Sequence, residues 1–178
     1  MGSDKALLVR DGRSQLEHVA ELLGAVTERV FVSVREQQQE EPERRRHAQI
    51  IDRFEGIGPI AGVLSAMTEY PEVDWLVVAC DLPNVDADTL AYLLENRSVT
   101  QPFTAYRSSY DGLPEPLCAL YRAGSGAIVR GFVEEGTICP RKILIRSDTK
   151  LLEQLNPAAL DNINTPDDLE VSVLEVAN

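Results

Sequence analysis

The chain has 178 residues, of which 44% are hydrophobic and 26% charged, an ordinary composition for a globular protein; we treat residues 1–178 as a single domain. The net charge of −12 argues against a broad nucleic-acid-binding face, and no apolar stretch reaches the roughly 18–20 residues of a membrane span. Three widely spaced cysteines and a start without a signal-peptide pattern indicate a reducing cytoplasm, and argue against a disulfide framework or zinc site.

The first fifty residues predict a helix and a strand around a polar segment. Lys5 follows a small-residue turn and can reach a phosphate, although a solvated lysine is the commoner case. Ser14 is a candidate cap for a helix with one apolar stripe, which we expect to stop near Gly24. Residues 30–34 are β-branched and aromatic and predict a strand. Residues 35–48 carry nearly cancelling charges and predict a solvated loop or short helix.

Asp52 follows a short apolar segment at residues 50–51, which we interpret as the end of a strand. It is the first acid in the chain at such a position. The glycine-rich stretch 56–62 then allows a backbone to approach a ligand closely, although a plain tight turn explains it equally well. Pro59 suits the first turn of a helix that we expect over residues 60–69.

The stretch W-L-V-V-A-C-D-L-P, residues 75–83, predicts a central strand followed by an acid, and the other predicted elements are interpreted around it. Its apolar run predicts a strand buried on both faces, as in a parallel sheet, and a proline stops it. Ligands of open α/β sheets lie outside the carboxyl ends of the strands, so Asp81 is placed where a ligand-facing acid belongs. The alternative is a turn or helix-capping aspartate.

Strands and helices continue to alternate after this point. The pattern predicts a helix capped by Asp86 or Asp88 that ends near residue 96, strands at 103–106 and 116–121, and a helix at 125–135. This alternation predicts an α/β fold with a mostly parallel sheet.

Two later segments carry polar groups that suit ligand binding. Arg141 and Lys142 bring two cations together, which either meet an anionic substrate or face water. Asn162 and Asn164 would share one face of a strand and offer both donors and acceptors, with a hydrogen-bonded turn as the alternative.

Five motifs resemble, in order, those of one family, the MobA-type molybdenum cofactor guanylyltransferases. The matching segments, each followed by the family pattern, are M-G-S-D-K-A-L-L at 1–8 (M-G-x-D-K-x-L-L), G-P-I-A-G at 58–62 (G-P-L-A-G), C-D-L-P at 80–83 (C-D-x-P), P-L-C-A-L-Y at 116–121 (P-L-x-A-L-Y) and N-I-N-T-P-D-D-L at 162–169 (N-x-N-T-P-E/D-D/E-L). Each motif is only moderately specific, but their shared order covers nearly the whole chain.

The resemblance implies a Rossmann-like three-layer nucleotidyltransferase fold that transfers GMP from Mg-GTP to the molybdopterin cofactor. On the nucleotide side it implies that Lys5 contacts phosphates, that Asp52 binds the nucleoside, and that Asp81 holds the magnesium ion. Ser33 stands where some members of the family have an asparagine near the nucleotide.

On the acceptor side, the resemblance implies that Asn162 and Asn164 lie beside the pterin. Arg141 and Lys142 are looser candidates for its terminal phosphate. The implied partners are GTP, the molybdopterin cofactor and molybdoenzyme maturation proteins.

The family has a buried strand and a glycine-rich loop, L-A-G-G-x-S-x-R, directly before M-G-x-D-K. The printed sequence begins at that methionine, so we expect the strand and the loop to lie upstream of residue 1 in a longer chain, with loss of both the loop and the activity as the alternative. Without them, the strands on both sides of the missing one would present unpaired edges.

Two other functions remain open. One is a related nucleotidyltransferase that uses CTP or another NTP, or another phosphorylated acceptor. The second is a catalytically inactive module that binds the pterin or docks to a maturation protein.

Overall fold

The structure is a computed structural model that describes residues 4–10 and 12–161. Its helices are α1 (Gln15–Val26), α2 (Ile60–Glu69), α3 (Ala87–Glu95), α4 (Gly126–Glu134) and α5 (Pro140–Arg146), with 3-10 helices η1 (Lys5–Leu7), η2 (Glu36–Gln38) and η3 (Arg44–Arg46). Its strands are β1 (Val9–Arg10), β2 (Arg13–Ser14), β3 (Phe31–Val34), β4 (Ala48–Ile51), β5 (Trp75–Val78), β6 (Phe103–Arg107), β7 (Pro114–Tyr121) and β8 (Thr149–Leu152). Within the described ranges, no helix is both long and apolar enough to cross a membrane.

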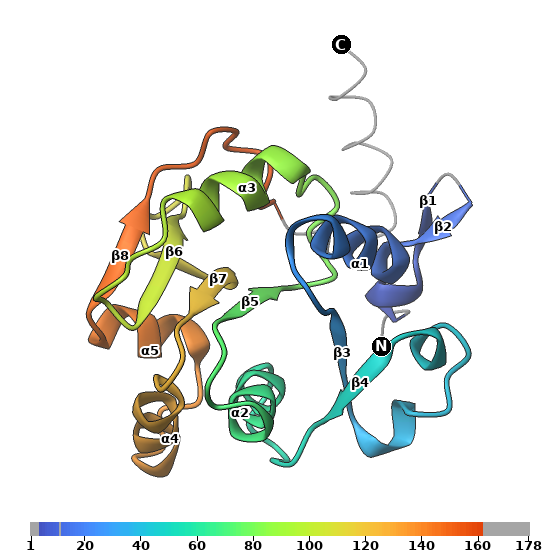
Figure 1. Ribbon diagram of the computed structural model, residues 1–178, viewed down its shortest axis with the longest axis horizontal. Helices are drawn as coiled ribbons and strands as arrows, with labels where there is room; N and C mark the ends of the chain where they lie inside the picture. The colour runs from blue at the N-terminus through green and yellow to red at the C-terminus, as the bar shows by residue number, and fades with distance from the viewer. Residues whose placement is uncertain (1–3, 11, 162–178) are drawn as a thin grey trace.

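The strands form mixed sheets, so the prediction of a mostly parallel sheet is wrong (Figure 1). The largest sheet has the order β5-β7-β6-β8, and β7 is antiparallel to both β5 and β6, whereas β8 is parallel to β6. A short turn at residues 108–113 joins β6 to β7, and strands joined in this way are antiparallel. Helices cover both faces of this sheet, so the burial pattern alone does not reveal strand direction.

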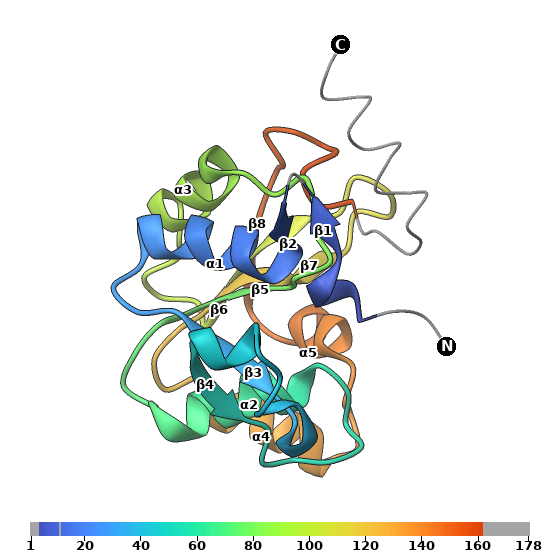
Figure 2. The ribbon, with the colours of Figure 1, turned by 90° about the vertical axis from the view of Figure 1, so that its right-hand side faces the viewer.

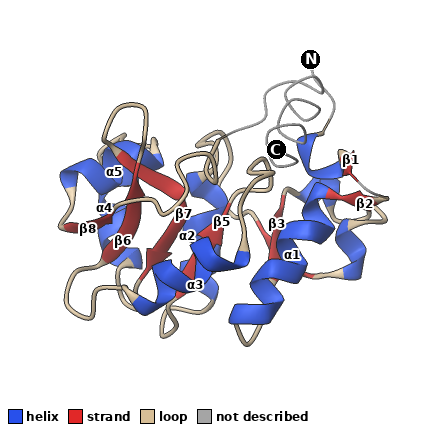
Figure 3. Ribbon diagram, turned by 90° about the horizontal axis from the view of Figure 1, so that it is seen from above, coloured by secondary structure: helices blue, strands red, loops and turns tan. Residues whose placement is uncertain are grey.

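Strands β3 and β4 form a separate parallel pair (Figure 1), and Figure 3 shows β3 on the side of β5 that faces away from β7. The Phe31 and Trp75 rings, whose centroids are 5.7 Å apart, link the start of β3 to the start of β5. Among the described residues no ladder joins β3 to β5, and the residues of β5 are only half-buried. The expected burial of this strand on both faces is therefore incomplete in the part of the chain that the structure describes.

The three-layer arrangement is present, with α1 and α3 on one side of the large sheet and α2, α4 and α5 on the other (Figures 1 and 2). Alternation along β7 divides its side chains between these layers. Ala119 and Tyr121 pack in the core beneath α2, α4 and α5, whereas Cys118 and Leu120 pack in the core beneath α1 and α3. The large sheet thus lies between two layers of helices, and the chain that leaves its strand β5 leads to the candidate residue Asp81.

The predicted helix caps are present. Ser14 Oγ accepts the Glu17 N–H at 3.1 Å, and Asp86 Oδ1 accepts the Thr89 N–H at 2.8 Å. The predicted stop at Gly24 is wrong, because α1 continues to Val26. Gly24 does not adopt a positive φ there, and one interior helical glycine costs only about 1 kcal/mol relative to alanine.

Candidate functional site

Asp81 lies three residues beyond the end of β5, and the 3-10 helix η1, which contains Lys5, lies beside it. Lys5 Nζ is 3.4 Å from Asp81 Oδ2, although 76 positions separate the two residues in the sequence. The Lys5 side chain is 37% exposed and that of Asp81 30%. This cation and this anion are therefore close together and both remain accessible to a ligand.

Two backbone contacts hold the chain around Asp81. Ala79 N–H donates to the Leu117 carbonyl at 2.7 Å, which ties the end of β5 to β7. The buried Gln15 Nε2 donates to the Leu82 carbonyl at 3.1 Å, which ties the start of α1 to the residue after Asp81. Gln15 was not predicted from the sequence, because nothing in the local pattern marks this first residue of α1 as buried.

Ser33 and Asp52 form a second polar pair at the carboxyl ends of β3 and β4. Ser33 Oγ donates to Asp52 Oδ1 at 2.7 Å. Asp52 N–H also donates to the Val34 carbonyl at 2.8 Å, which extends the parallel pairing by one residue. Parallel strands end at the same edge, so the structure brings together two residues that were singled out separately.

Gly62 allows α2 to approach this pair. A Cβ atom at position 62 would lie 2.1 Å from Ser33 Oγ, closer than atoms pack, and 3.3 Å from Asp52 Oδ1, a tight contact. Gly56 and Gly58 precede the helix with φ values of 74° and 66°, a conformation that side chains disfavour. The glycine pattern thus has a structural cause at each of these positions.

One apolar cluster contains chain neighbours of residues in both polar pairs. Its buried residues are Ala6, Leu16, Val32 and Val34, and Cys80 packs against them. Ala6 follows Lys5, Cys80 precedes Asp81, and the two valines flank Ser33, so both pairs are attached to one packed unit. No hydrogen bond or ion pair between the two pairs is found among the described residues.

The acceptor-side candidates are placed differently. Arg141, at the start of α5, donates to Asp111 Oδ2 at 3.0 Å and to Glu115 Oε2 at 2.8 Å. Glu115 lies at the amino end of β7, which runs beside the carboxyl end of β5, the end that carries Asp81. Lys142 is exposed. Asn162 and Asn164 lie outside the described residues.

The described side chains include no group of three or more histidine, cysteine or acidic residues that could hold a metal ion. Asp81 is nevertheless chemically suited to magnesium, which takes one or two carboxylates together with water and substrate phosphate oxygens. The neighbouring Lys5 ammonium suits the same phosphates.

Cys80 is the thiol closest to this site in sequence. Burial raises its pKa above the ordinary value, and the negative charges of Asp81 and Asp4 raise it further. Cys118 is buried in the sheet, which raises its pKa to about 12. Both thiols therefore stay protonated at neutral pH, whereas Cys139 is exposed.

We expect a thiol reagent such as Ellman's reagent, at pH 8, to label one cysteine per folded chain quickly. Cys139 should react first, and Cys80 and Cys118 at least about tenfold more slowly, because the thiolate is the reactive form. Unfolding in denaturant should release all three. A fast phase that persists in the Cys139→Ser variant would contradict this assignment.

A hollow of about 400 Å³ opens at the opposite end of β5, between the carboxyl end of α2 and the length of α4. Tyr70, Trp75 and Arg130 contribute to its lining. Trp75 begins β5 and Asp81 lies six positions further on, which corresponds to about 20 Å of extended chain. The hollow contains none of the candidate residues named above.

Comparison with known proteins supports the family suggested by the motifs. The MobA-like NTP transferase domain matches residues 1–149 of the chain. A protein of Synechocystis sp. named molybdenum cofactor biosynthesis bifunctional protein is 33% identical over 168 residues, which cover 94% of this chain and 48% of that protein. The chain thus spans about half the length of this relative. A Bacillus cereus (strain Q1) protein named "Probable molybdenum cofactor guanylyltransferase" is 26% identical, over 99% of this chain and 91% of that protein.

Solved structures agree on the fold. The molybdopterin-guanine dinucleotide biosynthesis protein A of Archaeoglobus fulgidus superposes with a TM-score of 0.79 at 24% identity, covering 99% of this chain and 92% of that one. The 2-C-methyl-D-erythritol 4-phosphate cytidylyltransferase of Thermus thermophilus superposes with a TM-score of 0.74 at 16% identity, covering 98% and 94%. The fold is therefore an α/β nucleotidyltransferase fold.

Proposed function

This chain belongs to the MobA-like NTP transferase family, and on that premise we propose that it transfers GMP from Mg-GTP to the molybdopterin cofactor. The products are the guanine dinucleotide form of the cofactor and pyrophosphate. The names of the relatives in Synechocystis and Bacillus cereus support the acceptor and the nucleotide. The single structural observation that carries the proposal is the meeting of Lys5 and Asp81 beyond the end of β5.

In the proposed reaction, a phosphate oxygen of the pterin attacks the α-phosphorus of GTP. A new P–O bond forms, the bond between the α-phosphorus and the bridging oxygen breaks, and pyrophosphate leaves with that electron pair. The attacking oxygen is already anionic, so no general base is needed. Catalysis then depends mainly on positioning and on neutralising the charge that spreads over the phosphate oxygens.

On the nucleotide side, Lys5 would bind the phosphates and Asp81 would hold a magnesium ion, which supplies charge neutralisation at the α-phosphate when bound. Asp52 and Ser33 would bind the nucleoside. Their mutual hydrogen bond of 2.7 Å fixes the carboxylate orientation and leaves the second carboxylate oxygen to accept from a ligand hydroxyl.

On the acceptor side, we propose Asn162 and Asn164 for the pterin and Arg141 with Lys142 for its terminal phosphate. The two carboxylates on Arg141 fix its guanidinium at the edge of the sheet that carries Asp81. They also neutralise part of its charge, which makes the exposed Lys142 the stronger candidate of the two.

A cytidylyltransferase activity is the second candidate. The similarity of the fold to a cytidylyltransferase from Thermus thermophilus favours it at the level of the backbone. That similarity rests on 16% identity, whereas the Synechocystis and Bacillus cereus relatives, at 33% and 26% identity, carry molybdenum cofactor and guanylyltransferase names.

A nucleotide panel with magnesium separates these candidates. We expect GTP at 100 times its Kd to stabilise the folded protein by about 2.7 kcal/mol, and ATP, CTP and UTP to do so much less, as measured by thermal shift. If CTP stabilises the protein more than GTP does, the proposal changes from guanylyl transfer to cytidylyl transfer.

The panel should be run on residues 1–178 and on the same chain extended by its upstream codons. Binding only by the longer protein would indicate that upstream residues complete the nucleotide site. If neither protein binds any nucleotide, the transferase proposal is wrong.

A further inference from the structure

Arg44 is a buried cation in a segment that the sequence suggests is solvated. Its side chain is only 7% exposed, whereas that of Arg46 in the same 3-10 helix η3 is 64% exposed. Arginine is almost never buried without partners, because an uncompensated buried charge is strongly destabilising. The partners of Arg44 therefore identify what this side chain holds in place.

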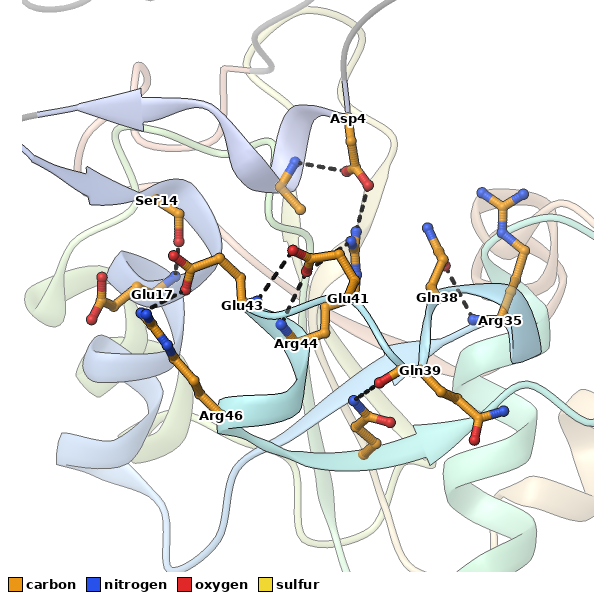
Figure 4. Close-up of polar contacts among 12 residues, drawn as sticks. Asp4, Ser14, Glu17, Arg35, Gln38, Gln39, Glu41, Glu43, Arg44 and Arg46 are labelled. Carbon is orange, nitrogen blue, oxygen red and sulfur yellow. Dashed lines mark hydrogen bonds and ion pairs between the residues drawn. The ribbon is translucent and has the colours of Figure 1, made fainter.

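The partners are two carboxylates from different parts of the chain (Figure 4). Arg44 Nη2 lies 2.7 Å from Asp4 Oδ2, across 40 positions of sequence, and Arg44 Nη1 lies 3.3 Å from Glu41 Oε2. Glu41 also accepts the backbone N–H of Glu43 and of Arg44, at 3.1 Å and 3.0 Å. Glu41, in the same loop, thus binds Nη1 of the guanidinium, and Nη2 remains to pair with Asp4.

Asp4 connects Arg44 to the N-terminal turn, which is the 3-10 helix η1. Its other carboxylate oxygen, Oδ1, accepts the Ala6 N–H at 3.2 Å and caps the 3-10 helix η1. Lys5 is the first residue of η1, and its Nζ lies 3.4 Å from Asp81 Oδ2. A single carboxylate therefore joins the buried arginine to the turn that carries the proposed phosphate-binding lysine.

We propose that Arg44 is a positioning residue for the nucleotide site: through Asp4 it fixes the η1 turn and aims Lys5 at the space beside Asp81. The inference rests on the proposed function in assigning Lys5 to the nucleotide phosphates. The geometry of the turn itself does not depend on that assignment.

The first test measures the turn directly by amide hydrogen exchange in the full chain. In Arg44→Gln, the amides of Ala6, Leu7 and Leu8 should exchange at least about tenfold faster, because a charge-assisted hydrogen bond no longer holds Asp4. The Glu17 amide, which Ser14 caps on α1, should be unchanged. Arg46→Gln is the matched control: it removes an exposed pair with Glu43 from the same helix and should leave all of these amides unchanged.

A second variant keeps the test decisive if Arg44→Gln does not fold. Asp4→Asn retains an Oδ1 acceptor for the Ala6 N–H but loses the charge that pairs with Arg44, and should also speed exchange in the turn. Arg44→Lys keeps the charge but lacks the planar fork that reaches two carboxylates, so it should restore protection only in part. Unchanged exchange in both Arg44→Gln and Asp4→Asn would overturn the proposal.

The third measurement is the affinity for Mg-GTP in a double-mutant cycle with Lys5→Ala. If Arg44 acts through Lys5, Arg44→Gln should weaken binding about tenfold in the original chain and less than about twofold when Lys5 is already alanine. If Arg44→Gln instead weakens Mg-GTP binding by the same factor in both backgrounds, Arg44 has a general structural role, and this result would count against the proposal. The cycle is measured in whichever form binds Mg-GTP, residues 1–178 or the upstream-extended chain. If neither form binds Mg-GTP, the proposed function is wrong, whereas the exchange experiment still judges the positioning role.

Discussion

Asp81→Asn is expected to lower turnover about 100- to 1,000-fold while the protein remains folded. The substitution keeps the shape of the side chain but removes the charge that would hold magnesium against the phosphates, an interaction of the kind that dominates such reactions. The Lys5–Asp81 pair is half-exposed at 3.4 Å, and exposed pairs contribute only about 0–1 kcal/mol to stability. Turnover with saturating Mg-GTP, together with the melting temperature, measures both quantities.

Asp148→Asn is a suitable control for Asp81→Asn. Asp148 is also exposed and accepts a hydrogen bond from Gln101 Nε2 at 2.7 Å, but it lies just before β8 and outside the candidate site. It should retain full turnover. If Asp81→Asn also retains full turnover, the metal role of Asp81 is wrong. A pterin-binding or docking module without activity would bind its partner equally well with or without the Asp81 charge.

Gly62→Ala is expected to destabilise the fold by about 1–3 kcal/mol, the usual cost of overpacking. The new methyl group would lie 2.1 Å from Ser33 Oγ and 3.0 Å from Ser33 Cβ. Rotation of the hydroxyl relieves the first contact but breaks the hydrogen bond to Asp52, and the second contact remains. Thermal melting should show a decrease of about 2–4 °C for each kcal/mol in a chain of this size.

Gly131→Ala is the matched control for Gly62→Ala. Gly131 lies inside α4, where an added Cβ meets nothing within 4 Å. Alanine should therefore stabilise the helix there by about 0.5–1 kcal/mol. In a Ser33→Ala background, Gly62→Ala should cost less, because the closest clashing atom is gone. Equal costs in both backgrounds would show that crowding against Ser33 is not the cause.

Local pattern in the sequence was sufficient for most individual elements. Residues 60–69 form α2 as predicted, because the apolar spacing and the preceding proline act over one or two turns. The caps at Ser14 and Asp86 formed for the same reason, since a cap joins residues only three positions apart. The predicted strands at 103–106 and 116–121 are β6 and β7, each extended by one or two residues.

The segment 35–48 shows where local pattern is insufficient. It is a mainly exposed loop with the short 3-10 helices η2 and η3, as predicted. Yet Arg44 is buried, while the adjacent Arg45 and Arg46 are exposed. All three arginines have an acidic partner within their own loop, and Arg44 is the one that also pairs with the distant Asp4.

The sequence by itself determined where helices and strands lie, which acids follow strand ends, and the family that the ordered motifs resemble, because these are properties of neighbouring residues. Only the tertiary structure decided the pairing of β7 with β5, the meeting of Lys5 with Asp81, the pairing of Ser33 with Asp52, and the burial of Arg44. Each of these depends on contacts between segments far apart in the chain, and such contacts leave no periodic or compositional signal in either segment. The candidate site is built from these long-range contacts, so its residues could be proposed from the sequence but their geometry could not.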